Sequence, residues 1–279
     1  MRPVKFSERI GAVRRVLQKD SMDEALKNAL WNVPYVLFWD DYAQRDTQRV
    51  GDVEQGRLLI QLWMNHFNQP LDQLGKYFPY ALRCVREKYM QNDWASIYDF
   101  VEFVATSKEI EHFSGAFIKT CNTTLEKHVS AYRFVGTTLA PITSEEEIAA
   151  IEQGMSHAGK FGPVAEHLAT ALARLADRPS PDCRNSIKES ISAVEAACQI
   201  ITGDSTATLG KALKQIGIHP ALEKGFLAIY GYTSDADGIR HALSEEPSLD
   251  ADDARFFLVS CSAFVNHLIA KSTGSTLSP

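Results

Sequence analysis

The chain has 279 residues, of which 45% are hydrophobic and 23% are charged, and its formal net charge is −6. This apolar fraction excludes a disordered chain, and the length suits one or two domains that each bury a core. No stretch reaches the roughly 18 consecutive apolar residues of a transmembrane helix, and the start lacks the apolar core of a signal peptide, so we expect a cytoplasmic protein.

Helical periodicity dominates the first half of the chain. Apolar residues at spacings of three and four predict an N-terminal helix whose buried stripe is Phe6, Ile10, Val13 and Leu17. Ser21 to Glu24 reads as a capping box that starts a second helix, which Pro34 is expected to end. Further helices are predicted over residues 54–67, 71–91, 95–105 and 108–128. The large aromatic residues expected in the core are Trp31, Phe38, Trp39, Trp63, Phe67 and Trp94.

One segment breaks this helical periodicity. Residues 131–135 and 139–142 read as two short strands around a turn at Gly136, which predicts a β-hairpin. The charge balance also changes there, because residues 1–139 carry 18 Lys+Arg and 17 Asp+Glu, whereas residues 140–279 carry 11 and 18. We therefore predict a mainly all-α fold of two helical domains, residues 1–139 and 140–271, with the hairpin between them and a flexible tail over residues 272–279.

The second half is again predicted to be helical. Ser144 to Glu147 forms another capping-box pattern, and prolines at 179 and 181 forbid helix continuation. Helices are expected over residues 164–175, 184–201, 209–216, 222–230 and 252–271, and residues 231–241 read as a polar loop. Apolar side chains cover well over half of the last helix, which predicts a homodimer through this domain. These side chains are Phe256, Phe257, Val259, Phe264, Val265 and Leu268.

The motifs of the common enzyme classes are missing from the sequence. It contains no GxGxxG, P-loop, HExxH or GxSxG pattern, and its five cysteines form no C-x-x-C pair. The eight histidines include no pair at helical i, i+4 spacing. We therefore expect neither a metal nor a cofactor.

The first of two polar groupings lies on the helix predicted over residues 184–201. On an ideal helix Arg184, Lys188 and Glu195 fall within about 40° of one another, at the border of the buried face. Charged groups at such a border need partners. The stripe therefore forms either an ion-pair network with a neighbouring helix or a site in which Glu195 orients another residue.

The second grouping lies in the polar loop and consists of Ser234, Asp235, Asp237, Arg240 and His241. A guanidinium beside an imidazole can bind a phosphodiester and transfer protons near neutral pH without a metal. This equipment suffices for RNA cleavage in which the 2′-hydroxyl is the internal nucleophile. The alternative is an Asp237–Arg240 salt bridge with His241 packed where the last helix begins.

Several segments resemble two protein families. Residues 6–11 (FSERIG), 30–32 (LWN) and 132–143, which include YRFVG and PIT, resemble the N-terminal domain of AbiJ-type abortive-infection proteins. Residues 184–195 (RNSIKESISAVE), 230–241 (YGYTSDADGIRH) and the last helix resemble the HEPN domain that follows it. Together these segments extend over nearly the whole chain.

The resemblance implies a bacterial antiphage effector with a helical, dimeric HEPN bundle and an N-terminal sensor or regulatory domain. Many HEPN domains are metal-independent ribonucleases that carry R-x(4–6)-H where the last helix starts. Carried onto this chain, His241 matches the histidine, Arg240 is the nearest arginine, and Glu195 fits the supporting polar residue of an earlier helix. The residues expected to contact the substrate are Arg184, Asn185, Lys188, Ser234 and Asp237.

The spacing of the two catalytic candidates differs from the family pattern, because Arg240 directly precedes His241 and no arginine lies between residues 185 and 239. Whether the chain is an enzyme therefore stays open. The alternative is a non-catalytic HEPN-like module that binds a nucleotide, RNA or a protein. The expected partners are a second copy of the chain, an RNA substrate and a regulatory or antitoxin protein, with no membrane.

Overall fold

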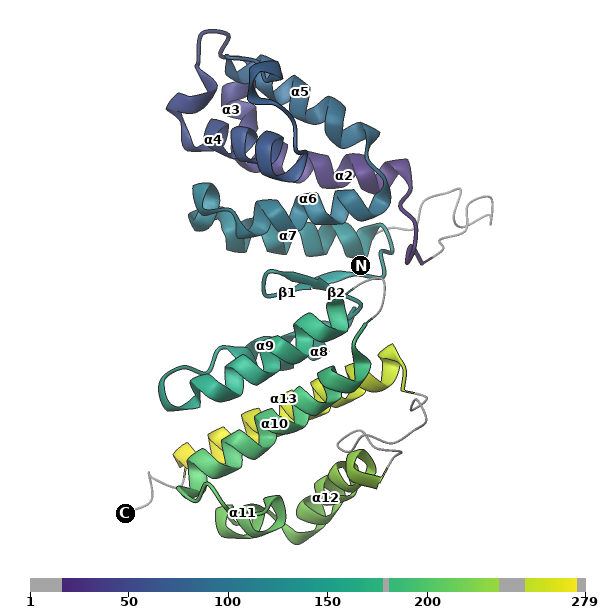
Figure 1. The fold of residues 1–279 in the computed structure, drawn as a ribbon, viewed down its shortest axis with the longest axis vertical. Helices are drawn as coiled ribbons and strands as arrows, with labels where there is room; N and C mark the ends of the chain where they lie inside the picture. The colour runs from purple at the N-terminus through teal and green to yellow at the C-terminus, as the bar shows by residue number, and fades with distance from the viewer. Residues whose placement is uncertain (1–16, 178–180, 236–248, 275–279) are drawn as a thin grey trace. The chain divides into compact units, whose positions relative to one another are not determined.

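The computed structural model describes residues 17–177, 181–235 and 249–274. Within these residues the chain is mainly helical and has one short β-hairpin between helical regions, which confirms the predicted fold class (Figure 1). The chain divides into two compact units, residues 1–143 and 144–279, and each is described by itself. The hairpin belongs to the first unit.

The helical part of the first unit consists of α-helices that alternate with short π-helical and 3₁₀ segments. Its regular elements are α2 (Glu24–Pro34), α3 (Asp40–Ala43), α4 (Glu54–Gln61), α5 (Phe78–Gln91), α6 (Trp94–Thr106), α7 (Ser114–Lys127), β1 (Arg133–Val135) and β2 (Thr138–Ala140). The π-helical turns Tyr35–Trp39 and Leu62–His66 continue α2 and α4. Short 3₁₀ turns lie at Val50–Asp52, Leu71–Gln73 and Lys108–Phe113.

Aromatic side chains fill the core of the first unit. The Trp31 ring packs against Trp39 and Tyr89, with ring centroids 5.4 and 5.1 Å apart, and Tyr89 meets Phe100 edge-on at 4.8 Å. Of the aromatic residues predicted for the core, Trp31, Phe38, Trp39 and Trp63 are buried, and Phe67 and Trp94 are partly buried against them. Aromatic rings bury a large area per residue, which explains how short helices hold together here.

Side chains from two helices attach the hairpin to the first unit. β1 and β2 pair antiparallel, with Phe134 opposite Leu139, and Gly136 makes the turn with a φ of 58°. The Asn122 amide on α7 bonds both backbone groups of Phe134, at 3.0 and 2.7 Å. On α6, Glu102 accepts a hydrogen bond from the Leu139 amide. The hairpin therefore extends the packing of α6 and α7.

Gln18 connects the start of the described chain to the segment just before the hairpin. Its backbone amide donates to the Val129 carbonyl, and the Ala131 amide donates to the Gln18 carbonyl, each at 2.9 Å. Its side-chain amide donates to the His128 carbonyl at 2.7 Å. Residues more than 100 positions apart in the sequence are thus joined by backbone pairing.

The start of α2 differs from the prediction. Asp23, not Ser21, caps the helix, and its carboxylate accepts a hydrogen bond from the Leu26 amide at 2.7 Å. Asp23 stands immediately before the first helical residue, where a carboxylate reaches the free amides and meets the positive end of the helix dipole. Leu17, predicted on a buried helical stripe, lies outside any helix and is 56% exposed. The rest of that stripe falls outside the described residues.

The α-helix α2 ends at Pro34 as predicted, and the chain then continues directly into the π-helical turn Tyr35–Trp39, which was not predicted. Proline has no backbone N–H to donate a hydrogen bond within the helix, and the π-helical turn begins at the residue that follows it. The helix predicted over residues 71–91 is wrong in its first part, because α5 begins only at Phe78, after the separate 3₁₀ turn Leu71–Gln73. Pro79 then occupies the first turn of α5, where the missing amide costs nothing.

His66, at the end of the second π-helical turn, contacts the rings of Phe67, Phe100 and Phe103. Its buried Nε2 has no hydrogen-bond partner among the described residues. Burial lowers the pKa of His66, and the charge of Asp99 opposes this shift. Since the unfolded chain binds the proton more tightly, the stability linked to His66 is present above about pH 6.5 and lost as the pH falls through the lowered folded-state pKa.

We therefore expect the free energy of unfolding of His66→Leu to fall less than that of the wild type when the pH is lowered from about 6.5 to about 5. The reduction should be below about 1 kcal/mol, because the side chain is only partly buried and solvent screens its charge. Urea denaturation at several pH values checks this. His112→Leu is the comparison variant, since it removes a histidine whose side chain is 67% exposed and lies 3.5 Å from Glu54. Equal profiles for wild type and His66→Leu would contradict the assignment.

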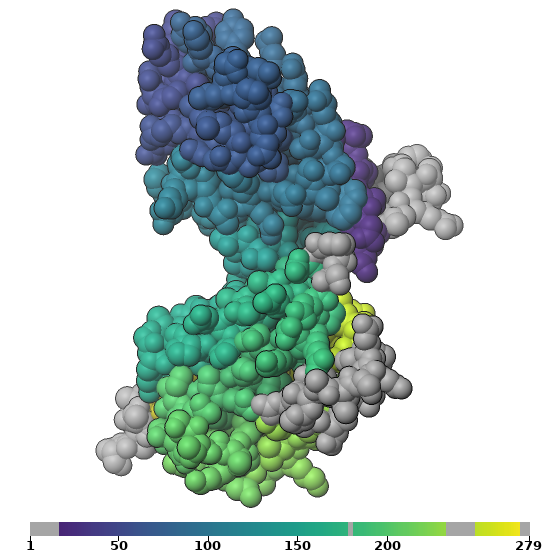
Figure 2. Space-filling view, in the orientation of Figure 1, coloured from purple at the N-terminus to yellow at the C-terminus, as the bar shows by residue number. Residues whose placement is uncertain are grey.

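The second unit is a bundle of longer helices. Its elements are α8 (Glu145–Met155), α9 (Gly162–Ala176), α10 (Cys183–Thr202), α11 (Leu209–Ile216), α12 (Pro220–Asp235) and α13 (Ala251–Gly274). The long α10 packs against α9, α13 and α11, and α8 packs against α9 and α13. In the space-filling view α11 and α12, in light green, lie on the surface of this unit (Figure 2).

In the second unit, the predicted start of α8 is correct and the predicted end of α12 is wrong. The Ser144 hydroxyl caps α8 by accepting a hydrogen bond from the Glu147 amide at 3.3 Å, as the sequence pattern predicts. The predicted loop over residues 231–241 is wrong in its first part, because α12 continues as helix to Asp235. No proline lies between Tyr230 and Asp235, and Gly231 alone does not end the helix.

Candidate functional site

Of the three residues predicted to be catalytic, the structure describes Glu195, which forms a hydrogen bond between α10 and α12. The Tyr230 hydroxyl donates to Oε1 of Glu195 at 2.9 Å. Glu195 is half-buried, and Tyr230 lies five residues before the end of α12. The carboxylate predicted to orient another residue therefore contacts the helix that leads into residues 236–248, which carry Arg240 and His241.

This hydrogen bond borders a pocket of about 340 Å³ between α10, α11 and α12, which we call the α10–α12 pocket. It is lined by Glu195, Cys198, Gln199, Ala207, Thr208, Leu209, Gly210, Leu227 and Tyr230. Burial raises the pKa of the Cys198 thiol to about 12, and the nearby Glu195 charge adds to the shift. Cys198 is thus a protonated and unreactive thiol at neutral pH, so Glu195 and Tyr230 supply the ionisable groups of this pocket.

The other residues of the predicted α10 stripe lie nearer the start of the helix. Arg184 is half-buried and Lys188 is exposed. The Asn185 side chain donates to the Asp182 carboxylate at 2.7 Å, and the Asn185 backbone amide donates to the same carboxylate. These bonds cap α10 and lower the pKa of Asp182. The stripe thus places two cations toward one end of α10 and a carboxylate farther along it.

Acidic residues surround the start of α10. Burial raises the pKa of Cys183, and the charges of Asp250, Asp182 and Asp253 raise it further. Asp250 and Asp253 stand where α13 begins. The starts of α10 and α13 therefore lie close together, and residues 236–248 join the end of α12 to this region.

Several predicted site residues cannot be placed. Asp237, Arg240 and His241 fall outside the described residues. Ser234 and Asp235 form the end of α12, with backbone positions described.

Two contacts of the second unit were missed from the sequence. No sequence pattern predicts the pairing of the Tyr230 hydroxyl with Glu195, because it depends on how α12 packs on α10. His167 on α9 contacts Glu189 on α10, with Nδ1 and Oε2 2.6 Å apart. No spacing rule links positions 22 residues apart on two helices, so no local signal could have found this pair.

Two properties of the described residues bear on metals and membranes. No group of three or more His, Cys, Asp or Glu side chains within them is placed to hold a metal ion. None of their helices is both long enough and apolar enough to cross a membrane.

Comparison with known proteins gives one match. Residues 4–156 match the model of a family described as AbiJ N-terminal domain 4. No curated protein and no solved structure matches the chain. The match covers the first unit and extends through α8, although α8 packs against α9 and α13 of the second unit. An AbiJ N-terminal domain points to an abortive-infection antiphage system, and, because the match spans more than half of the sequence, the chain belongs to the AbiJ N-terminal domain 4 family.

Proposed function

We propose that the chain is an antiphage effector of the cytoplasm, in which the first unit senses or regulates and the second is a HEPN-like, metal-independent ribonuclease. The observation that carries this proposal is the 2.9 Å hydrogen bond between Tyr230 and Glu195. It ties the carboxylate of α10 to the helix that precedes Arg240 and His241, which is where a residue supporting these two would be needed.

The proposed reaction is an internal transesterification of RNA. The 2′ oxygen bonds to phosphorus while the bond to the 5′ oxygen breaks, giving a 2′,3′-cyclic phosphate and a 5′-hydroxyl end. His241 accepts the proton of the 2′-hydroxyl or donates one to the leaving 5′ oxygen. Arg240 stabilises the extra negative charge on the phosphoryl oxygens. Glu195 is a positioning residue that acts through Arg240 or His241.

Substrate contacts are assigned to the remaining polar residues. Arg184 and Lys188 supply positive charge on α10, and Asn185, Ser234 and Asp237 supply hydrogen-bonding groups. The acidic residues at the starts of α10 and α13 repel a phosphate backbone. RNA should therefore approach along the exposed side of Lys188, and a regulatory or antitoxin protein could occupy the same side.

A second candidate, the non-catalytic HEPN-like module, is favoured by the adjacent Arg240 and His241, whose spacing differs from R-x(4–6)-H. It would bind a nucleotide, RNA or a protein without cleaving it. The two candidates are separated by incubating the purified full-length chain with RNAs of varied sequence, with and without EDTA. Cleavage that survives EDTA and leaves cyclic phosphate ends supports the ribonuclease, and intact RNA in every reaction contradicts it.

We also propose that the second unit forms a homodimer. Much of the apolar surface of α13 is covered within the chain, since Phe257, Phe264, Val265 and Leu268 are buried. Phe256 remains 54% exposed, and the neighbouring Phe257 ring stacks on Tyr232, which is 50% exposed. Sedimentation velocity at micromolar concentration should show a dimer that Phe256→Glu converts to a monomer. A wild-type monomer under these conditions would contradict the proposal.

A further inference from the structure

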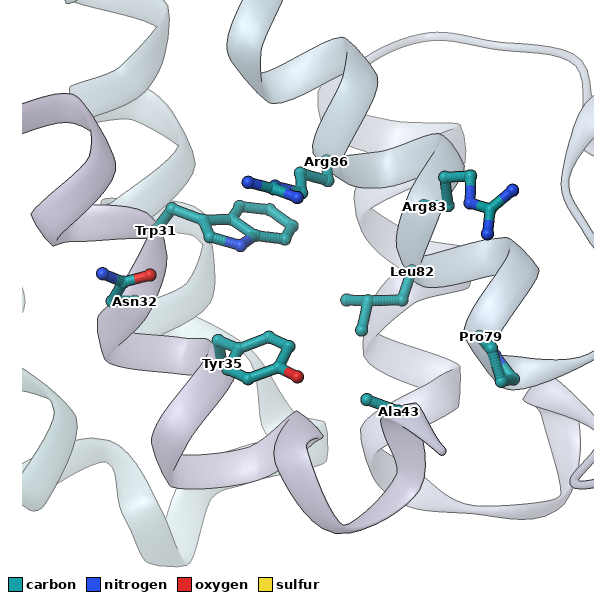
Figure 3. A pocket seen from close by; sticks show the side chains of 8 residues that line it. All are labelled: Trp31, Asn32, Tyr35, Ala43, Pro79, Leu82, Arg83 and Arg86. Carbon is teal, nitrogen blue, oxygen red and sulfur yellow. The ribbon is translucent and has the colours of Figure 1, made fainter. Parts of the chain in front are cut away.

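The first unit contains a cavity that the proposed nuclease chemistry does not use. Its volume is about 450 Å³, within the usual range for small-molecule sites of about 300–1,000 Å³. We call it the arginine pocket. It is lined by Trp31, Asn32, Tyr35, Ala43, Pro79, Leu82, Arg83 and Arg86 (Figure 3). These residues come from α2, the π-helical turn after it, α3 and α5.

The backbone irregularity after Pro34 shapes one wall of the arginine pocket. Tyr35 is the first residue of the π-helical turn, and the Asp40 amide donates back to the Tyr35 carbonyl across five residues. π-Helical turns are rare and occur frequently at functional sites. Here the turn places the Tyr35 ring across the cavity from Leu82, and the two side chains point toward one another (Figure 3).

The walls of the arginine pocket suit a flat, largely apolar group. Trp31 and Leu82 are buried, and Tyr35 is half-buried. The Trp31 ring is fixed from behind by Trp39 and Tyr89. Rings held in this way lose little freedom when a planar ligand stacks on them, and stacking of one base on one aromatic side chain contributes about 1–3 kcal/mol in single-strand-binding proteins.

The charge at the mouth of the arginine pocket is positive. Arg83 and Arg86 are exposed and lie one helical turn apart on α5, but the Arg86 guanidinium points toward the Trp31 ring and that of Arg83 points away from the cavity (Figure 3). Among the described residues neither guanidinium pairs with a carboxylate within 4 Å; Arg83 lies over the Tyr80 ring at 5.9 Å. No acidic residue lines the cavity, and the Asp40 carboxylate is hydrogen-bonded to the Tyr35 side chain. The Arg86 guanidinium, which points into the pocket beside Trp31, can bind a phosphate group (Figure 3).

We propose that the arginine pocket binds a free nucleotide of mononucleotide size, with its planar base between Tyr35 and Leu82 and its phosphate on Arg86. Figure 3 shows the Arg86 guanidinium beside the Trp31 ring and that of Arg83 at the outer edge. This assignment does not depend on ribonuclease activity in the second unit. It gives the first unit a ligand class that fits a sensing role.

Isothermal titration calorimetry on the full-length chain tests the assignment. AMP, GMP, CMP and UMP are titrated beside the matching nucleosides, inorganic phosphate and a 5′-phosphorylated tetranucleotide. At least one mononucleotide should bind at one site per chain, at least about tenfold more tightly than its nucleoside or inorganic phosphate. Only the nucleotide can contact both the Tyr35–Leu82 wall and the Arg86 guanidinium. Tighter binding of the tetranucleotide than of every mononucleotide would overturn the proposal, as would the absence of saturable binding.

Variants locate the binding site. Arg86→Gln should weaken nucleotide binding about tenfold or more, whereas Arg57→Gln, at an exposed arginine paired with Glu54 outside the pocket, should change it less than about twofold. Tyr35→Ala should weaken binding about tenfold, and Tyr35→Phe, which keeps the ring, should restore it. Unchanged circular dichroism shows that each variant folds.

A matched variant separates this site from the proposed catalytic one. His241→Ala should leave mononucleotide affinity unchanged even where it stops RNA cleavage. If His241→Ala abolishes nucleotide binding while Arg86→Gln preserves it, the nucleotide occupies the second unit and the arginine-pocket assignment is wrong. If nucleotides bind at the arginine pocket but RNA stays intact, only the ribonuclease proposal fails.

Discussion

Replacing His241 by alanine should lower the rate of RNA cleavage by about 10²- to 10⁴-fold, the usual cost of losing a proton-transfer group. Induction of the wild-type chain should arrest bacterial growth, and induction of His241→Ala should not. Arg240→Lys should also lose activity, because an ammonium cannot reproduce the bidentate phosphate contacts of a guanidinium. EDTA should leave the wild-type rate unchanged, since the proposed proton transfers and charge stabilisation come from side chains alone.

His167→Gln is the matched control for this experiment. His167 is another histidine of the second unit, held by Glu189 on a different pair of helices, and its replacement should alter the cleavage rate by less than about twofold. Both variants should show the wild-type circular dichroism. If His241→Ala cleaves RNA as fast as wild type, the ribonuclease assignment is wrong. If His167→Gln is the inactive variant, the catalytic histidine lies on α9 instead.

Gly56→Ala should destabilise the first unit by about 3 kcal/mol, although alanine is normally the better helix former. A Cβ at position 56 would meet the Val50 carbonyl oxygen at 1.9 Å and its carbon at 2.8 Å. Val50 cannot easily move away, because its amide donates to the Lys76 carbonyl at 3.1 Å and Arg49 pairs with Tyr77. The variant must therefore distort either α4 or the segment at Val50.

Urea unfolding followed by tryptophan fluorescence measures this effect selectively, since all four tryptophans lie in the first unit. Gly115→Ala on α7 provides the control, because a Cβ there meets nothing within 4 Å. It should leave stability unchanged or raise it by up to about 1 kcal/mol. Gly56→Ala with a midpoint at or above that of wild type would show that the close approach of α4 to Val50 does not constrain this position.

Prediction from sequence succeeded where one local signal governed the structure. The stripe over residues 95–105 became α6, the Gly136 turn became the hairpin, and Ser144 caps α8. It was incomplete where signals competed. Pro34 ends α2 as predicted, but burial of Phe38 and Trp39 in the aromatic core favours the π-helical turn that follows it. The helix predicted from residue 71 starts only at Phe78. Gly75, just before it, packs so closely on Tyr80 that a Cβ there would clash.

The candidate sites were predictable only in part, because they combine residues from helices that are distant in the sequence. Glu195 could be placed on a helix beside the buried face because periodicity fixes that face. Its partner Tyr230 is 35 residues away and meets it only once α12 has packed on α10. The arginine pocket had no sequence signal, since its walls come from α2, α3 and α5 and depend on the π-helical turn after Pro34. Contacts of this kind are set by tertiary packing.

The backbone pairing of Gln18 with Ser130 links two distant segments within the first unit. It brings the start of the described chain next to the segment that precedes the hairpin. Closing a loop of this length costs about 4 kcal/mol in chain entropy, and Val129 adds strain with a φ of 56°. The three hydrogen bonds that join Gln18 to residues 128–131 offset these costs inside the unit itself. We therefore expect the first unit to keep its fold when a different domain follows Thr143.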